Sequence, residues 1–232
     1  MIPHADFPRD YVILVDKPLT WTSFDVVNKV RYGGKFKKVG HAGTLDPLAT
    51  GLLILCTGKK TKEIDLYQGQ EKEYTGSFVL GKTTPSVDLE TEFDQEYPIE
   101  HITEDTIQVA LNALTGDIQQ TPPMHSAVKV GGKRAYEAAR QGKSLELKVR
   151  QVSVPVFELD TRDFPTLHFR IVCSKGTYIR SLVRDFGVLV GSGAYLSSLR
   201  RTRIGDFRIE DARSIDSLIQ ELKEREGILS AE

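Results

Sequence analysis

One carboxylate in the sequence has a setting suited to chemistry. Asp46 lies within residues 40–51 (GHAGTLDPLATG), where three glycines permit tight turns and close backbone approach. The proline after Asp46 disfavours helical backbone at the aspartate, and the apolar run at 52–56 indicates a buried strand. We therefore expect Asp46 on a stiff, sharply turned loop, either as a reactive carboxylate or only as the acceptor of a local Asx-turn.

Three further side chains could act with this carboxylate. Tyr74, on a predicted strand, offers a ring for stacking on a base and a phenol for proton transfer, or only core packing. Arg180 lies in the first turn of a predicted helix, where a cation opposes the helix dipole and requires either a partner such as Asp46 or solvent. Leu199 precedes a run of arginines and offers an apolar contact there, or belongs to the core.

Residues 76–83 (GSFVLGKT) match the phosphate-binding pattern G-x-x-x-x-G-K-[ST]. That chemistry requires a loop that opens into a helix whose N-terminus faces the phosphate. The middle residues are strand-like and no helix is predicted after Lys82, so we interpret the match as chance.

The 232 residues, 40% hydrophobic and 27% charged, have the composition of a soluble globular protein with a substantial core. No apolar run approaches the roughly 20 residues that span a bilayer, and the N-terminus has no signal-peptide pattern. Cys56 and Cys173 lie in apolar runs, which predicts buried thiols in a reducing compartment. The five histidines show no ligand spacing, so no metal is predicted.

Charged residues are segregated along the chain, although the net charge is only −1. Basic residues gather at 31–38, 129–150 and 200–203, and acidic residues gather at 88–105 and after 210. This distribution fits a protein with one positive face, or merely solvated surfaces.

Hydrophobic periodicity predicts strands alternating irregularly with helices. Strands are expected at 11–15, 52–56, 73–80, 145–158, 167–174 and 195–204. Helices are expected after Ser23 as N-cap, at 58–69, 103–114, 134–140 and 178–190, and near the C-terminus. Hairpin signals outnumber regular βαβ spacing, which indicates a mixed α/β (α+β) fold around a central, largely antiparallel sheet.

The stretch 41–53 resembles the signature of the TruB family of tRNA pseudouridine-55 synthases. The likeness continues, in the family's order, through residues 16–18, 72–74, 122–127, 136–142, 174–180 and 199–201. It extends from about Val12 to about Phe207, nearly a whole catalytic domain.

This resemblance implies an enzyme that isomerises the T-loop uridine of tRNA to pseudouridine, with Asp46 as the essential carboxylate. Tyr74 would stack on the target base, and Arg180 would pair with Asp46. The substrate-binding set would be His41, which helps hold the flipped-out loop, Leu199, which lines the base pocket, Lys17 and Tyr178. The RNA-binding set would be Lys129, Lys133, Arg134, Arg140, Arg200 and Arg201.

The resemblance also implies one catalytic domain, 1–210, with a mobile insertion at about 122–145. Residues 211–232 would form a short helical tail, too short for the PUA-type module of many relatives. An isomerisation requires no cofactor. We expect a cytoplasmic protein acting on the tRNA T-arm stem-loop without metal, membrane or obligatory protein partner. The alternatives are a guide-RNA-dependent relative and a non-catalytic RNA chaperone.

Overall fold

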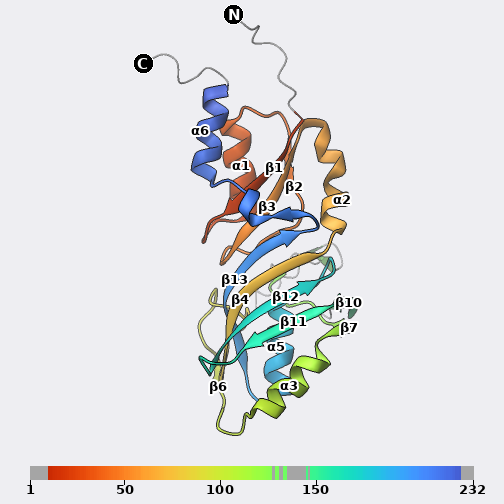
Figure 1. The fold of residues 1–232 in the computed structure, drawn as a ribbon, viewed down its shortest axis with the longest axis vertical. Helices are drawn as coiled ribbons and strands as arrows, with labels where there is room; N and C mark the ends of the chain where they lie inside the picture. Colours follow the sequence, from red (N-terminus) through yellow and green to blue (C-terminus); the bar gives the residue numbers. More distant parts are fainter. Residues whose placement is uncertain (1–9, 127–128, 131–132, 135–144, 146, 226–232) are drawn as a thin grey trace, which may run out of the picture. The chain divides into compact units, whose positions relative to one another are not determined.

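The computed structural model describes residues 10–126, 129–130, 133–134, 145 and 147–225 (Figure 1). The chain divides into two units. Unit 1 contains the residues up to Glu73 and from Arg200 onward, and unit 2 contains Tyr74–Leu199. Strands β4 (Lys72–Leu80) and β13 (Ala194–Ile204) contribute residues to both units.

Unit 1 is built on the antiparallel pair of β1 (Val12–Lys17) and β3 (Ala49–Thr57). Strand β2 (Val39–His41) pairs with β3, and β14 (Phe207–Arg208) pairs with β13. The other elements of the unit are α1 (Ser23–Gly33), η1 (Gly58–Glu63), α2 (Ile64–Gly69), η2 (Ile209–Asp211) and α6 (Ile215–Arg225).

Strand β3 is buried on both faces, which explains its uninterrupted apolar sequence. Leu53 and Leu55 pack with residues of α1 and α6. The alternate residues Leu52, Ile54 and Cys56 pack with side chains of α2, β14 and η2. The predicted buried strand is confirmed, and it supplies the rigid end of the Asp46 loop.

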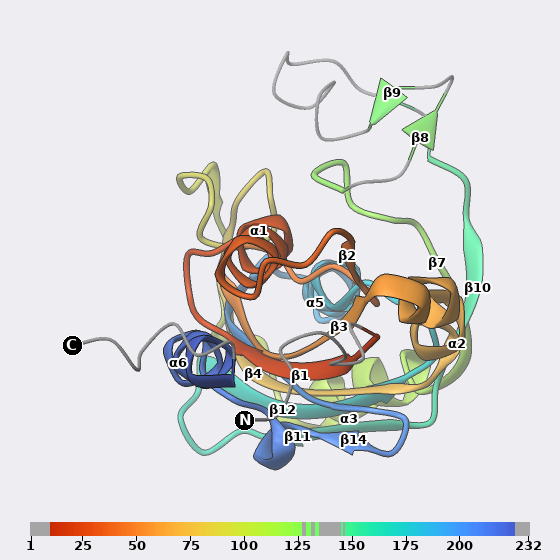
Figure 2. The same ribbon diagram turned by 90° about the horizontal axis from the view of Figure 1, so that it is seen from above.

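Helix α6 belongs to the core of unit 1. Ile215, Leu218 and Ile219 join the same apolar cluster as α1, and Figure 2 shows both helices nearly end-on. Two backbone hydrogen bonds tie the segment before α6 to β1: Asp16 N donates to Arg213 O at 2.9 Å, and Arg213 N donates to Leu14 O at 3.1 Å. Within the stretch predicted as a helical tail, residues 215–225 are helical, and they pack in the unit that carries Asp46.

Unit 2 contains the sheet formed by β4, β12 (Thr166–Cys173), β11 (Val156–Asp160) and the first part of β13. Smaller pairs are β5 (Lys82–Thr83) with β6 (Gln95–Glu96), β7 (Gly116–Gln120) with β10 (Arg150–Val154), and β8 (Lys129–Val130) with β9 (Lys133–Arg134). Helices α3 (Glu104–Ala113) and α5 (Ile179–Leu189) complete the unit.

An aromatic cluster fixes α5 against this sheet. The Phe186 ring of α5 lies 5.1 Å from the Phe78 ring of β4 and 6.3 Å from the Phe157 ring of β11. The Phe78 ring is also 6.2 Å from the Phe169 ring of β12. Because these rings are large and buried, they hold the start of α5, and with it Arg180, at a fixed place in unit 2.

The prediction of a mixed α/β fold with a largely antiparallel sheet is confirmed. The strand predicted at 145–158 is instead two strands separated at Pro155, which has no N–H to donate to a sheet. Residues 76–80 lie in β4 and strand β5 follows them, so this segment has no phosphate-binding loop geometry.

Candidate active site

Asp46 occupies a tight turn between β2 and β3. Ala49 N donates a hydrogen bond to Asp46 O at 3.0 Å, which closes the turn around Pro47. Gly43 and Gly51 flank it with φ of +91° and +104°, values that L side chains rarely adopt. The Asp46 side chain is half-buried. The expected stiff loop is confirmed.

Segment 17–23, which precedes and begins α1, supports this loop from one side. The Ser23 hydroxyl accepts a hydrogen bond from Leu45 N at 2.8 Å and donates to Leu45 O at 3.1 Å. Thr20 N donates to Pro47 O at 2.9 Å. Both neighbours of Asp46 are therefore held in place. Ser23 was predicted to cap α1, but the cap is Thr22, which forms a capping box with Asp25 and leaves Ser23 for the loop.

Arg201 supports the loop from the other side. Its side chain is 1% exposed, its Nε donates to Leu52 O at 2.7 Å, and its Nη2 donates to Gly43 O at 3.1 Å. A Cβ on Gly51 would lie 2.3 Å from the Arg201 carbonyl oxygen, so the two backbones require glycine there. Two of the three guanidinium nitrogens, Nε and Nη2, are therefore used inside the fold. The predicted RNA contact of Arg201 would require these hydrogen bonds to be displaced, and it stays a prediction.

Lys17 is also a structural cation. Its side chain is fully buried, and Nζ donates to Trp21 O at 2.6 Å, Pro18 O at 2.9 Å and Pro47 O at 3.3 Å. Burial lowers the pKa of Lys17 to about 8, although the nearby charge of Asp46 acts to raise it. Because backbone carbonyls enclose its ammonium group, a substrate contact of Lys17 would require these hydrogen bonds to be displaced, and it stays a prediction.

His41 ends β2, immediately before the loop. Its Nδ1 atom is buried and has no hydrogen-bond partner among the described residues. Burial, followed by the positive charge of Arg201, lowers the pKa of His41, so the imidazole is neutral at pH 7. Its role in holding a flipped-out loop stays a prediction.

In unit 2, Arg180 has a buried carboxylate partner that the sequence did not predict. Arg180 Nε lies 3.7 Å from Asp88 Oδ2, and the two side chains are 4% and 6% exposed. Its Nη1 donates to Ser86 O at 3.0 Å and its Nη2 to His125 O at 2.8 Å. The guanidinium is therefore fixed in orientation. Its predicted pairing with Asp46 joins residues of different units and stays a prediction.

Gln120 holds the start of α5. The amide of Gln120 accepts a hydrogen bond from Tyr178 N at 2.8 Å and donates one to Tyr178 O at 3.1 Å. Because Tyr178 is the N-cap of α5, this paired contact fixes the turn that carries Arg180. A substrate contact of the Tyr178 side chain stays a prediction.

Tyr74 is 9% exposed on β4, and Phe78 and Leu80 share its buried face. Leu199 is half-buried near the end of β13. For both residues the structure is compatible with a contact to a base and with core packing.

The predicted RNA-binding residues have different outcomes. Arg200 donates to both carboxylate oxygens of Asp16, at 3.0 and 2.7 Å, so a phosphate contact would require displacement of Asp16. Lys129 pairs with Arg134, and Val130 with Lys133, in the β8–β9 ladder. Arg140, with the helix predicted around it, lies outside the described residues.

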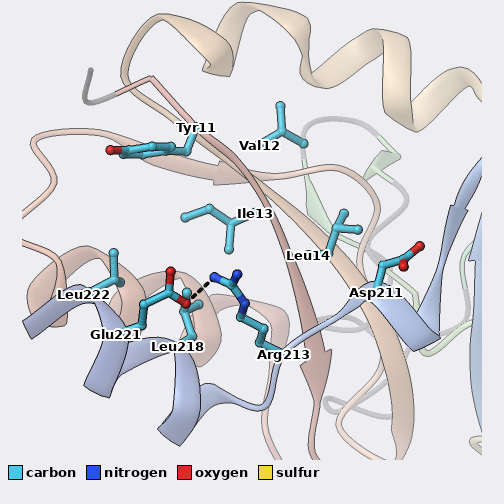
Figure 3. Close-up of a pocket in the computed structure, with 9 residues that line it drawn as sticks. All are labelled: Tyr11, Val12, Ile13, Leu14, Asp211, Arg213, Leu218, Glu221 and Leu222. Atoms are coloured by element: carbon cyan, nitrogen blue, oxygen red, sulfur yellow. Dashed lines mark ion pairs between the residues drawn. The ribbon is translucent and has the colours of Figure 1, made fainter. Parts of the chain in front are cut away.

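A cavity of about 270 Å³ lies elsewhere in unit 1, between β1 and α6 (Figure 3). Tyr11, Ile13, Leu218 and Leu222 line it, and Arg213 and Glu221 form an ion pair at its edge. None of the predicted catalytic residues lines this cavity, so we do not assign it to the chemistry. Among the residues that the structure describes, no group of three or more His, Cys, Asp or Glu side chains is arranged to hold a metal ion.

No sequence pattern singled out Asp88, Ser86 and Gln120, or the contact of Ser23 with the Asp46 loop. Asp88 and Ser86 fall in an acidic stretch without periodicity, and their partner Arg180 follows about 90 positions later. No local pattern could have found them.

Comparison with solved structures agrees with this fold. A Cbf5-Nop10-Gar1 complex contains a chain with a TM-score of 0.71 and 29% identity, covering 98% of this chain and 61% of that one. An H/ACA RNP bound to a substrate RNA containing 2′-deoxyuridine gives a TM-score of 0.69 at 26% identity, covering 97% and 59%. This chain thus spans about three fifths of those structural relatives.

Curated relatives are more similar. The tRNA pseudouridine synthase B of Phocaeicola vulgatus is 52% identical over 95% of this chain and 97% of its own length. That of Flavobacterium johnsoniae is 52% identical over 90% and 96%, and that of Chlorobaculum tepidum is 46% identical over 95% and 93%.

These curated relatives are RNA-modifying isomerases, and the chain is similar to them over nearly its whole length. The family model for the N-terminal domain of TruB family pseudouridylate synthases matches residues 31–179, which include Asp46, Tyr74, Asp88 and the start of α5. The chain belongs to the TruB family of pseudouridylate synthases, as its resemblance indicated.

Proposed function

We propose that this protein converts the T-loop uridine of tRNA to pseudouridine. The observation that carries the proposal is the rigid Asp46 loop, held by Ser23, Thr20 and Arg201, inside the segment that the family model matches. The names of the curated relatives supply the RNA class.

The reaction breaks the N1–C1′ bond of uridine and rejoins the base through C5. The uridine must first leave its stack, at a cost of a few kcal/mol. Stacking on an aromatic side chain returns about 1–3 kcal/mol per base, and we assign that role to Tyr74.

We assign to Asp46 the attack on C1′ or C6, or the removal of a proton from C2′. Arg180, already fixed by Asp88, would keep the carboxylate ionised in a pocket that excludes water. We assign the wall of that pocket to Leu199. No redox change and no energy input are involved, so the reaction requires no cofactor.

We further propose that the protein acts in the cytoplasm without an obligatory protein partner or guide RNA. None of the helices among the described residues has the length and apolar character to cross a membrane.

The test is site-resolved pseudouridine mapping on an unmodified tRNA transcript incubated with purified protein. We expect conversion by the wild type and by Asp65→Asn, a matched control on exposed α2. Asp46→Asn should bind the transcript without converting it. Equal conversion by Asp46→Asn would disprove the role of the carboxylate. Failure of the wild type on bare tRNA, with activity restored by an added guide RNA, would support the guide-dependent alternative. Restoration of tRNA function in a deletion strain by Asp46→Asn would support an RNA chaperone.

A further inference from the structure

The exposed half of α1 and the turn into β2 carry positive charge that the proposed reaction does not use. Lys29, Arg31, Lys37 and Lys38 are all exposed, and Tyr32 among them is 73% exposed. We call these five residues the α1–β2 basic surface.

This surface exists because α1 has a narrow apolar side. Val26, Val27 and Val30 are buried in the core of unit 1, so at 100° per residue the other half of the helix faces solvent. In the turn that follows, the buried Phe36 ring precedes Lys37, and Phe36 N donates to Arg31 O at 2.9 Å. The cations therefore stand on a fixed scaffold.

No acid within the surface neutralises these charges. Asp25 is the one carboxylate between Thr22 and Leu45, and it is occupied by hydrogen bonds from Thr22 N at 2.8 Å and Thr22 Oγ1 at 2.6 Å. Among the described residues, none of the four cations of the surface takes part in an ion pair. By contrast, other cations of unit 1 have acidic partners: Lys60, Arg200, Arg203 and Arg213.

The surface is joined directly to the Asp46 loop within one unit. Ser23, the first residue of α1, holds Leu45, and β2 leads from Lys38 into His41. Lys29 and Arg31 lie six and eight residues after Ser23, about 9 and 12 Å along the helix at 1.5 Å per residue, so the basic half of α1 lies about that far from the loop. An RNA with a nucleotide at Asp46 can therefore extend over it.

We propose that the α1–β2 basic surface binds the sugar–phosphate backbone of the tRNA during the reaction, with the Tyr32 ring against a base or ribose. Arg31 lies 5.9 Å from the centre of the Tyr32 ring, so a phosphate contact and a stacking contact are presented together. This inference rests on the proposed function for the identity of the RNA.

The experiment compares two double variants of the surface, Lys29→Gln/Arg31→Gln and Lys37→Gln/Lys38→Gln, with a matched control, Arg208→Gln/Lys223→Gln. The control removes the same charge from exposed positions of unit 1 outside the surface. Binding to an unmodified tRNA transcript is measured over a series of KCl concentrations, in the Asp46→Asn background so that no product forms. Thermal melts establish that each variant is folded.

Each surface variant should weaken tRNA binding on the order of tenfold and lower the slope of log K against log salt by about 2. The control should remain within about twofold of the parent. Tyr32→Ala should weaken binding on the order of tenfold with an unchanged salt slope, since stacking releases no counterions. With Asp46 intact, the surface variants should raise KM and leave kcat unchanged.

Salt slopes for the surface variants equal to those of the control would overturn the inference. A second outcome would also overturn it: the wild type binds anionic phosphatidylserine vesicles, and the surface variants lose that binding but keep their tRNA affinity. The partner of the surface would then be a membrane. If the wild type binds tRNA with these slopes but forms no pseudouridine, the proposed function fails and the binding surface stands.

Discussion

Replacing Arg201 by methionine tests whether this arginine supports the Asp46 loop or contacts RNA. The sequence predicted that Arg201 contacts RNA. In the structure its side chain is 1% exposed and its guanidinium holds the Asp46 loop. Arg201→Met keeps the length and apolar stem of the side chain and removes its donors to Leu52 O and Gly43 O. The expected consequence is loss of stability and of loop geometry together.

The magnitude follows from these two contacts. Hydrogen bonds from a charged group contribute about 1.5–3 kcal/mol each, so two give about 3–6 kcal/mol. Removing a buried charge recovers part of its desolvation cost, and we expect a net loss of about 3 kcal/mol. For a domain of this size that lowers Tm by about 6–12 °C.

The assay is thermal and urea unfolding of the wild type, Arg201→Met and the exposed control Arg208→Met, together with tRNA binding at a temperature where all are folded. Removal of the Arg201 charge should also raise the pKa of His41, which NMR can follow. A Tm within about 2 °C of the wild type, combined with weakened tRNA binding, would refute the structural role and restore the RNA contact.

Three further outcomes are expected. Gly51→Ala should lower the free energy of unfolding, measured by urea titration, by more than about 3 kcal/mol. Its φ is +104°, and the new Cβ would lie 2.3 Å from the Arg201 carbonyl oxygen of β13. The control Gly69→Ala, where the new Cβ meets open space, should be nearly neutral. Asp88→Asn should lower kcat for pseudouridine formation on the order of 10²-fold with a smaller change in KM, because Arg180 loses the carboxylate that orients it; unchanged kcat would contradict this. The pKa of Lys17 in the folded protein, about 8, lies below the ordinary lysine value of 10.5. The unfolded chain therefore binds more protons between these pH values, and stability rises with pH there. Relative to Lys17→Met, the wild type should gain about 3 kcal/mol from pH 8 to 10.5, and parallel stability curves would contradict the burial of the charge.

Local features could be predicted from the sequence because their causes lie within a few residues. The turn at Asp46 follows from glycines and a proline within a dozen positions, and the buried strand after it from an apolar run. The predicted N-cap of the first helix, Ser23, is one residue away from the observed N-cap, Thr22. Both residue types are good caps, and only the contact of Ser23 with the Asp46 loop decides which one caps the helix.

The uses of the charged side chains were decided by tertiary structure. Arg201 and Leu52 are separated by 149 positions, and Arg180 and Ser86 by 94, so no periodicity connects them. In the sequence, Lys17, Arg201 and Lys38 are three similar cations. The fold encloses the first two among backbone carbonyls and leaves the third in solvent, because a buried charge persists only where chain segments supply acceptors around it. The sequence alone pointed to the Asp46 loop as the candidate site, and the packing of distant segments determined which residues support that loop.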